Sequence, residues 1–228
     1  MSDISQKRSF MFRRLSPIFL SILSLVILTT VTGCAAPPEG SAEWYFARAL
    51  QYAQQGDYQN AIVNYTEAIK VEPLLSKAYV NRAAAYVILA DYDKAIADCD
   101  KALSLESDLP IAYINRASAY NAKGNYDQAI QDSDKAIELD HKLAQAYINR
   151  AYAYNRKGDM YKSIADCNEA LEIEPNLADG YYHRALAYKA LDKKEEAIAD
   201  FQKFINLSNN ETLIENAKQE INKLSASK

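Results

Sequence analysis

The chain has 228 residues, of which 25% are charged and 49% are apolar, so its composition is not that of a disordered protein. Its formal net charge of −4 lacks the basic excess that is usual in nucleic-acid-binding proteins. Three cysteines, an odd number, give no disulfide framework.

Residues 1–33 have the layout of a secretory signal. Four basic residues come first, and an apolar run follows from Ile18 to Val31. The order of charged, apolar and small residues is typical of a signal peptide. An uncleaved membrane anchor is the alternative, but the run is short for a hydrocarbon core of roughly 30 Å. We therefore expect residues 1–33 to be removed.

The signal ends in Val31-Thr32-Gly33-Cys34, which resembles the lipobox of bacterial lipoproteins. The resemblance implies cleavage before Cys34, lipidation of the Cys34 thiol, and a short tether over residues 34–41. By the same resemblance, Ala35 after the cysteine implies the periplasmic face of the outer membrane, if the organism has one. Cleavage also removes four basic residues and Asp3, which changes the net charge from −4 to −7.

One motif returns every 34 residues through the rest of the chain. It reads "AYVNRAAAY" at 78–86, "AYINRASAY" at 112–120, "AYINRAYAY" at 146–154 and "GYYHRALAY" at 180–188. A fixed period of this length indicates a solenoid. Five units fit the period: 42–75, 76–109, 110–143, 144–177 and 178–211. Each unit contains two amphipathic stretches around a short break such as "KGNY" at 123–126, which predicts a pair of helices.

Small residues recur where two such helices must approach closely. Alanine occupies the eighth position of every unit, and alanine or serine occupies the twentieth. This pattern resembles the tetratricopeptide repeat, with tyrosine, arginine and alanine in place of the usual tryptophan, leucine and glycine at positions four, seven and eight. The resemblance implies an all-α, right-handed superhelix (an α-solenoid) of five 34-residue repeats. A capping helix is expected over 211–225, with Ser208 and Glu211 forming a capping box at its start.

Arginine at the seventh position is unusual for a site that is normally buried. An aspartate at the twenty-third position recurs in step with it, so we expect each pair to form a two-pronged ion pair that joins helices. An anionic ligand is the alternative partner for these arginines. The pairs are Arg82 with Asp98, Arg116 with Asp132, Arg150 with Asp166, and Arg184 with Asp200.

An amide precedes most of these arginines, on the helix that lines the concave face in the tetratricopeptide fold. The row resembles the asparagine ladder of the O-linked N-acetylglucosamine transferase, which implies that it holds the main chain of an extended peptide. Bridging between neighbouring helices is an equally open interpretation. The candidate peptide-binding residues are Asn81, Asn115, Asn149 and His183, with an apolar wall of Phe46, Ile114, Ile148, Tyr152 and Tyr182.

Catalytic and metal-binding motifs are absent from the sequence. Neither His141 nor His183 has a second histidine or cysteine at metal-ligand spacing, and there is no phosphate-binding glycine loop. The carboxylate clamp that binds acidic chaperone tails does not fit either, because Phe46, Leu50 and Ile111 occupy three of its polar positions. We therefore expect no enzyme activity and no cofactor.

Together these features predict a lipid-anchored adaptor that binds an extended segment of another protein in its groove. The alternative is a constitutive structural subunit of an envelope assembly complex, which would use the convex face or the helix ends. Neither prediction involves nucleic acid or a small-molecule substrate.

Overall fold

The computed structural model describes residues 36–226, which fold into eleven helices without a strand. The helices run α2 Ala42–Gln54, α3 Tyr58–Val71, α4 Ser76–Ile88, α5 Tyr92–Leu105, α6 Pro110–Lys123, α7 Tyr126–Leu139, α8 Ala144–Lys157, α9 Met160–Ile173, α10 Ala178–Ala190, α11 Lys194–Leu207 and α12 Glu211–Ala226. The predicted signal peptide, the lipobox and Cys34 lie outside the described residues.

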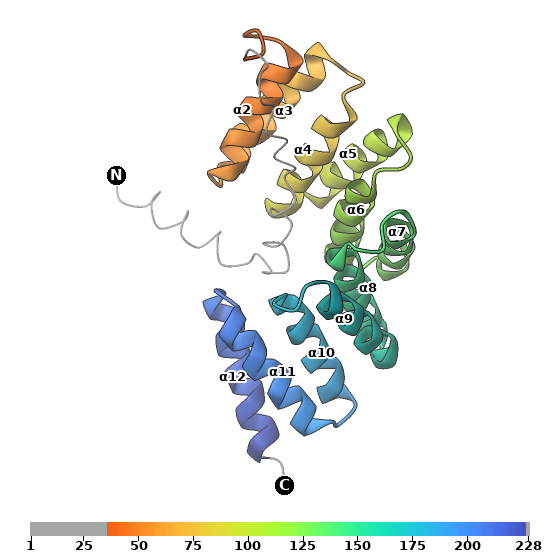
Figure 1. Ribbon diagram of the computed structural model, residues 1–228, viewed down its shortest axis with the longest axis vertical. Helices are drawn as coiled ribbons and strands as arrows, with labels where there is room; N and C mark the ends of the chain where they lie inside the picture. Colours follow the sequence, from red (N-terminus) through yellow and green to blue (C-terminus); the bar gives the residue numbers. More distant parts are fainter. Residues whose placement is uncertain (1–35, 227–228) are drawn as a thin grey trace, which may run out of the picture.

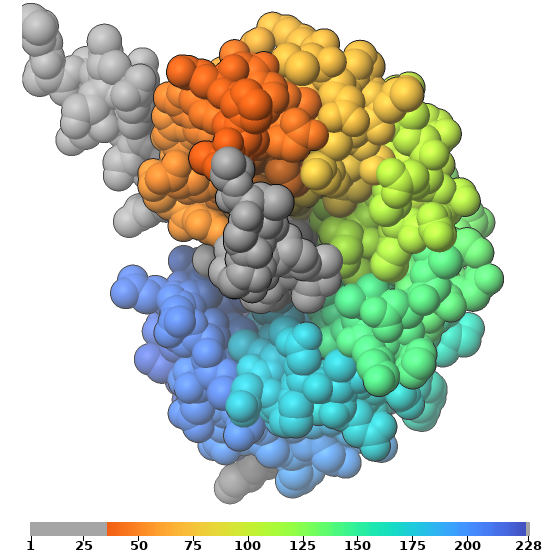
Figure 2. All heavy atoms as spheres, turned by 45° about the horizontal axis from the view of Figure 1, so that its top comes forward, coloured from red at the N-terminus to blue at the C-terminus, as the bar shows by residue number. Residues whose placement is uncertain are grey.

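Consecutive helices pair and stack into a curved solenoid, with α2 and α12 at its two ends (Figure 1). The first helices of neighbouring units also contact each other directly, α4 with α6, α6 with α8, and α8 with α10. The second helices of neighbouring units come less close, so the first helices lie on the inside of the curve. Figure 2 shows the same units curling around a common centre. The all-α superhelix of five repeats is confirmed.

Small residues allow the two helices of each unit to pack tightly. Ala83, Ala117 and Ala151 at the eighth position are fully buried, as are Ala95 and Ala129 at the twentieth. Helices that meet through such small side chains can approach to the lower end of the usual interaxial range of about 8–10 Å. The sequence pattern therefore sets the spacing within each unit.

The turn between the two helices of a unit requires a left-handed backbone at the fifteenth position of the unit. Gly124 and Gly158 adopt φ of 80° and 87° there. Ala90 and Asp192 occupy the same position with φ of 60° and 57°, a conformation that costs a side-chain-bearing residue free energy. Two of the five turns are therefore strained relative to the glycine turns.

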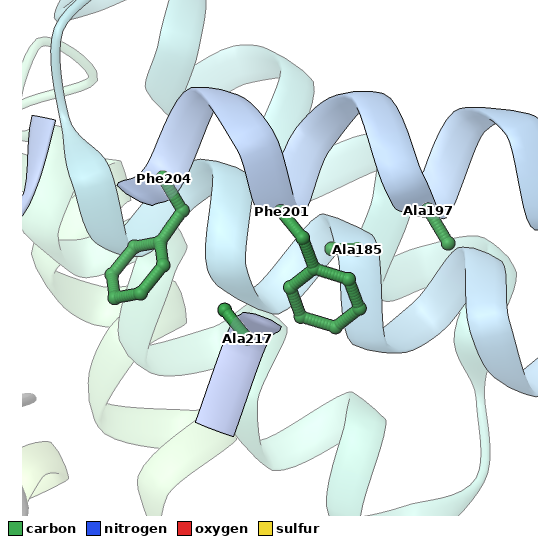
Figure 3. Packing of buried hydrophobic residues seen from close by; sticks show 5 residues of the cluster. All are labelled: Ala185, Ala197, Phe201, Phe204 and Ala217. Atoms are coloured by element: carbon green, nitrogen blue, oxygen red, sulfur yellow. The ribbon is translucent and has the colours of Figure 1, made fainter. Parts of the chain in front are cut away.

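The last helix, α12, seals the end of the solenoid. Phe201 and Phe204 of α11 point toward Ala217 of α12, and all three are buried (Figure 3). Burying two phenylalanine side chains contributes about 1.5–3 kcal/mol each. The predicted capping box is wrong: Asn210, not Ser208, caps α12, because the main-chain N–H of Leu213 donates to Asn210 Oδ1 at 2.9 Å.

Candidate functional site

The predicted arginine–aspartate ladder is present in units two to five. In each unit, Nε and Nη2 of the arginine donate to the two carboxylate oxygens of the aspartate sixteen residues later, at 2.7–2.9 Å. The remaining nitrogen, Nη1, donates to a residue on the second helix of the preceding unit. These second acceptors are Thr66, Asp100, Asp134 and Asn168, respectively.

Each arginine also lies over a tyrosine ring of its own helix, at 5.5–5.6 Å from the ring centre. The hydrogen bond with Asp132 raises the pKa of Arg116, whereas burial raises the pKa of Asp132 and Arg116 opposes that shift. The guanidinium groups are thus engaged by the protein itself. The ladder joins helices within and between units, as the sequence predicted.

The amide row of the first helices also connects neighbouring units. Asn115 Nδ2 donates to the main-chain carbonyl of Val80 at 3.2 Å, 35 residues earlier. Asn149 repeats the bond with Ile114 O at 3.1 Å and adds a second to Ser118 Oγ at 2.9 Å. These bonds join α6 to α4 and α8 to α6 on the inner side of the solenoid.

The amides at the twelfth position donate in the opposite direction, to a carbonyl of the following unit. Asn121 Nδ2 donates to Asn149 O at 2.8 Å, and Asn155 Nδ2 donates to His183 O at 2.9 Å. Both kinds of amide bond join α6 to α8, whereas α4 and α6 are joined only through Asn115, and α8 and α10 only through Asn155. The bonds recur because the residues recur every 34 positions.

This geometry corrects the expectation of an exposed amide ladder. Asn115 and Asn149 are 0% and 1% exposed, and both use their donors within the protein. Bridging between helices, the second interpretation of the sequence, is what the structure shows for these two residues. Asn81 differs, because it is partly exposed and donates only to Lys77 O of its own helix at 2.8 Å.

His183 takes the place of the asparagine in the fifth unit and is also buried. Its ring lies between Tyr152 and Tyr182, at 5.5 Å and 5.7 Å between ring centres. Neither ring nitrogen has a hydrogen-bond partner among the described residues. Burial lowers its pKa to about 4. The expectation that His183 presents a polar group to a partner is therefore wrong in this structure.

The apolar wall divides into buried and accessible residues. Ile114 and Ile148 are 3% and 0% exposed. Phe46, Tyr152 and Tyr182 remain partly exposed. A role for these three and for Asn81 in peptide binding stays a prediction.

A pocket of about 550 Å³ opens at the ends of α6 and α8, beside the loops that lead into α8 and α10. Ile114 and Asn115 line it, and the Oδ1 atom of Asn115 has no hydrogen-bond partner among the described residues. The other lining residues come from the starts of α6, α8 and α10, the end of α9, and the loops before α8 and α10: Ile111, Lys142, Leu143, Ala144, Gln145, Ile173, Glu174, Pro175, Asn176, Leu177 and Ala178.

The sequence did not single out the loop residues of this pocket. Leu143 and Leu177 hold the last position of their units, and Pro175 is one of two prolines that survive near a unit's end. Their recurrence was visible, but their convergence on one hollow depends on how far each unit rotates against the next. Period alone does not specify that rotation.

Other reactive groups are ordinary parts of the core. Cys99 and Cys167 are free and buried, as expected for small apolar residues, and burial raises the pKa of the Cys167 thiol to about 12. Residues 36–226 contain no group of three histidine, cysteine, aspartate or glutamate side chains placed to hold a metal ion. In the same part of the chain, the helices are too short or too polar to cross a membrane.

Comparison with known families places every unit of the solenoid. Sequence models described as "Tetratricopeptide repeat" match residues 42–75, 76–109, 110–143, 144–177 and 178–211. No curated protein is a significant match to the chain.

Solved structures with a similar fold share little sequence with the chain. The crystal structure of MamA has 24% identity and a TM-score of 0.60, over 69% of this chain and 92% of that one. TTC0263, a thermophilic TPR protein of Thermus thermophilus, has 18% identity and a TM-score of 0.66, over 80% and 98%. YrrB, described as a TPR protein with an unusual peptide-binding site, has 19% identity and a TM-score of 0.58, over 78% and 92%.

Proposed function

The chain belongs to the tetratricopeptide repeat family, and from that premise we propose that it is a membrane-anchored adaptor whose concave groove binds an extended segment of another protein. The fold is that of an interaction scaffold, and proteins of this kind generally act without catalysis. A lipid on Cys34 would hold the adaptor on the periplasmic face of the outer membrane. The lipobox supports that part of the proposal.

The main support for peptide binding in the groove is the pocket between α6, α8 and the loop before α10. Its walls contribute isoleucine, leucine and proline side chains, which suit an apolar side chain of a bound segment. Lys142, Gln145 and Glu174 at the same pocket supply polar groups that can meet a main chain. We therefore assign the binding contacts to this pocket in units three to five, and not to the buried amide row.

The free energy that micromolar binding requires indicates that apolar contacts must contribute to it. Each hydrogen bond adds only about 0.5–1.5 kcal/mol net, and micromolar binding needs about 8 kcal/mol. Burying one or two apolar side chains of the partner in the pocket can supply several kcal/mol of the difference, at about 25 cal/mol per Å². We therefore expect the bound segment to carry a large apolar residue.

Site-specific photocrosslinking tests the groove. A photoreactive side chain at Ile111, which lines the pocket, should crosslink to the partner in intact cells. The matched control places the same group at Val63, which is 56% exposed on α3. Crosslinks from position 63 with none from position 111 would contradict the groove.

A structural subunit that uses its outer surface is the second candidate. Its support is the presence of four large apolar side chains on the surface, each more than half exposed: Val63, Val71, Leu74 and Tyr161. Crosslinks confined to these positions would favour this candidate over the adaptor.

The lipid anchor has its own test. A Cys34→Ser variant in which the signal peptide of a secreted protein without a lipid anchor replaces residues 1–33 should move from the membrane fraction to the soluble fraction. The mature wild-type N-terminal peptide should carry the mass of its acyl chains. An unmodified Cys34 in protein isolated from membranes would contradict the anchor and leave the groove proposal intact.

A further inference from the structure

The exposed side of α2 differs in sequence from the same side of every later first helix. Positions three and ten are small and buried in units two to five, where the preceding unit packs against them. In the first unit these positions hold Trp44, the chain's single tryptophan, and Gln51. The small residues are Ala78, Ala112, Ala146 and Gly180 at position three, with Ala85, Ala119, Ala153 and Ala187 at position ten.

An indole at position three would hold a preceding repeat away from α2, because close helix packing there requires a small side chain. Gly180 illustrates how tight the position is, since a Cβ added to it would lie 2.8 Å from Leu171. The outer side of α2 is therefore not shaped to continue the solenoid, and another surface must cover Trp44 if anything does.

Arg48 gives this side of α2 a single available cation. It is the seventh-position arginine of the first unit, but Asn64 replaces the aspartate that pairs with it elsewhere. Among the described residues no carboxylate is bonded to Arg48. Its guanidinium lies over Trp44 at 5.1 Å and over Tyr52 at 5.9 Å, measured to the ring centres.

These three side chains line a hollow of about 610 Å³, which we name the α2 face. Arg48 is the only charged residue of the face, and the other lining residues are Pro37, Ala47, Gln51 and Gln55. Glu43 in the first turn of α2 is also exposed, so this side of the helix has no excess of positive charge that would attract anions in general. A single guanidinium beside two amphipathic rings can instead bind one phosphate group while the rings make apolar contacts around it.

We propose that the α2 face docks on the phospholipid surface, with Arg48 on a headgroup phosphate and Trp44 and Tyr52 at the interface. The proposal rests on the lipid anchor at Cys34. Seven residues lie between Cys34 and Ala42, so the tether spans eight Cα-to-Cα steps and reaches at most about 28 Å at roughly 3.5 Å per step. A turn shortens it further, because the main-chain N–H of Ser41 donates to Pro38 O at 3.0 Å.

Arg48 is the one charged side chain that lines the α2 face, so it can meet a headgroup phosphate there even though the lipidated chain would carry a net charge of −7 and the exposed Glu43 lies in the same helix. Docking would fix the first unit on the membrane and leave units three to five, with their pocket, extending away from it. The anchor would then hold the solenoid in one orientation instead of on a free tether.

The single tryptophan makes the docking measurable. Lipidated protein purified from bacterial membranes is placed in vesicles of phosphatidylethanolamine and phosphatidylglycerol. Iodide quenching of Trp44 is compared with that of a soluble Cys34→Ser protein in buffer, which lacks residues 1–33. We expect quenching to fall about threefold on vesicles, because an indole at the interface is shielded from aqueous iodide. Lipids brominated near the headgroup should quench the same emission.

Two variants separate docking from anchoring. Arg48→Glu should restore iodide quenching while the protein still floats with the vesicles. Arg156→Glu is the matched control, since Arg156 is also exposed and stacked on a tyrosine, Tyr126, at 5.9 Å, but lies in α8. It should leave the quenching of Trp44 unchanged.

Each remaining outcome has one interpretation. Protein that floats with the vesicles while Trp44 is as accessible as in buffer overturns the docking and leaves the anchor standing. Protein that does not float overturns both. Protection of Trp44 that appears only with a co-purifying protein, and not on pure lipid, assigns the α2 face to a protein partner and overturns the lipid docking.

Discussion

The arginine–aspartate ladder and the amide row run through the same units with the same period, yet they are satisfied to different degrees. In the ladder, each guanidinium bonds to a carboxylate of its own unit and to an acceptor of the preceding one. In the amide row the donors are used, but Asn115, Asn121 and Asn155 each leave Oδ1 without a partner among the described residues. Regular spacing in sequence therefore does not guarantee complete pairing in space.

The difference follows from the number of acceptors that each group finds. A guanidinium fork and a carboxylate match in shape, so one aspartate satisfies two donors. A carboxamide between two helices meets main-chain carbonyls, which accept from its NH₂ but offer nothing to its oxygen. We infer that the ladder contributes more to stability per residue, and that the amide row is the weaker junction between units.

Breaking the ladder should have the largest effect. Arg116→Met leaves Asp132 buried without its partner, and we expect the free energy of unfolding to fall by about 3–5 kcal/mol. Urea denaturation followed by circular dichroism measures it. The double variant Arg116→Met/Asp132→Leu should recover most of the loss, because both charges are then gone. A single variant as stable as the wild type would show that the ladder contributes nothing.

His183, the exception in the amide row, should make stability depend on pH. Its pKa is about 4 in the folded protein, below the ordinary value of 6.5. Between these values the unfolded chain binds a proton that the folded protein does not, so stability falls as pH drops from 6.5 to 4, by about 2–3 kcal/mol.

His183→Asn should remove that contribution to the pH dependence, and urea midpoints at pH 7.5 and 4.5 compare the two proteins. The carboxylates titrate in both proteins, so the difference between them isolates the histidine. Parallel pH profiles would contradict a buried, neutral His183.

A single cut in the amide row should have a smaller effect. Asn149→Ala removes two donated bonds that join α8 to α6, and we expect a loss of about 1–2 kcal/mol. Asn81→Ala is the matched control, because Asn81 bonds only within its own helix; its change should stay within about 0.5 kcal/mol. Equal losses would remove the distinction between the two asparagines.

The turns provide a stability reference that involves neither the arginine–aspartate ladder nor the amide row. Ala90→Gly should raise the free energy of unfolding by about 1 kcal/mol, because Ala90 has φ of 60°, and Gly124→Ala should lower it by about as much. Thermal unfolding of both variants measures the pair. Combining Ala90→Gly with Asn149→Ala should give additive changes if the turn and the row are independent. A loss of stability in Ala90→Gly would show that the turn is not strained.

Several features of the fold were predictable residue by residue. The recurring alanines fixed the close contact within each unit, and the pairing of Arg116 with Asp132 followed from the cost of burying an unpaired guanidinium. The start of α12 at Glu211 was predicted correctly, but its cap was not, because Ser208 and Asn210 are both good capping residues and only the path of the chain decides between them.

The candidate site was less predictable. Asn115 and Asn149 were placed on the right helices and toward the inside of the curve, but their bonds to Val80 and Ile114 depend on the distance between neighbouring inner helices. The pocket that brings Ile111 together with Leu177 depends on the same distance.

The sequence by itself determined the number of units, the helix pairs and the ion pairs within each unit, because these involve residues at fixed separations along the chain. Only the tertiary structure decided whether a side chain on the inner helices meets solvent or the next helix. That outcome depends on the curvature summed over several units, to which every interface contributes and which no single motif encodes.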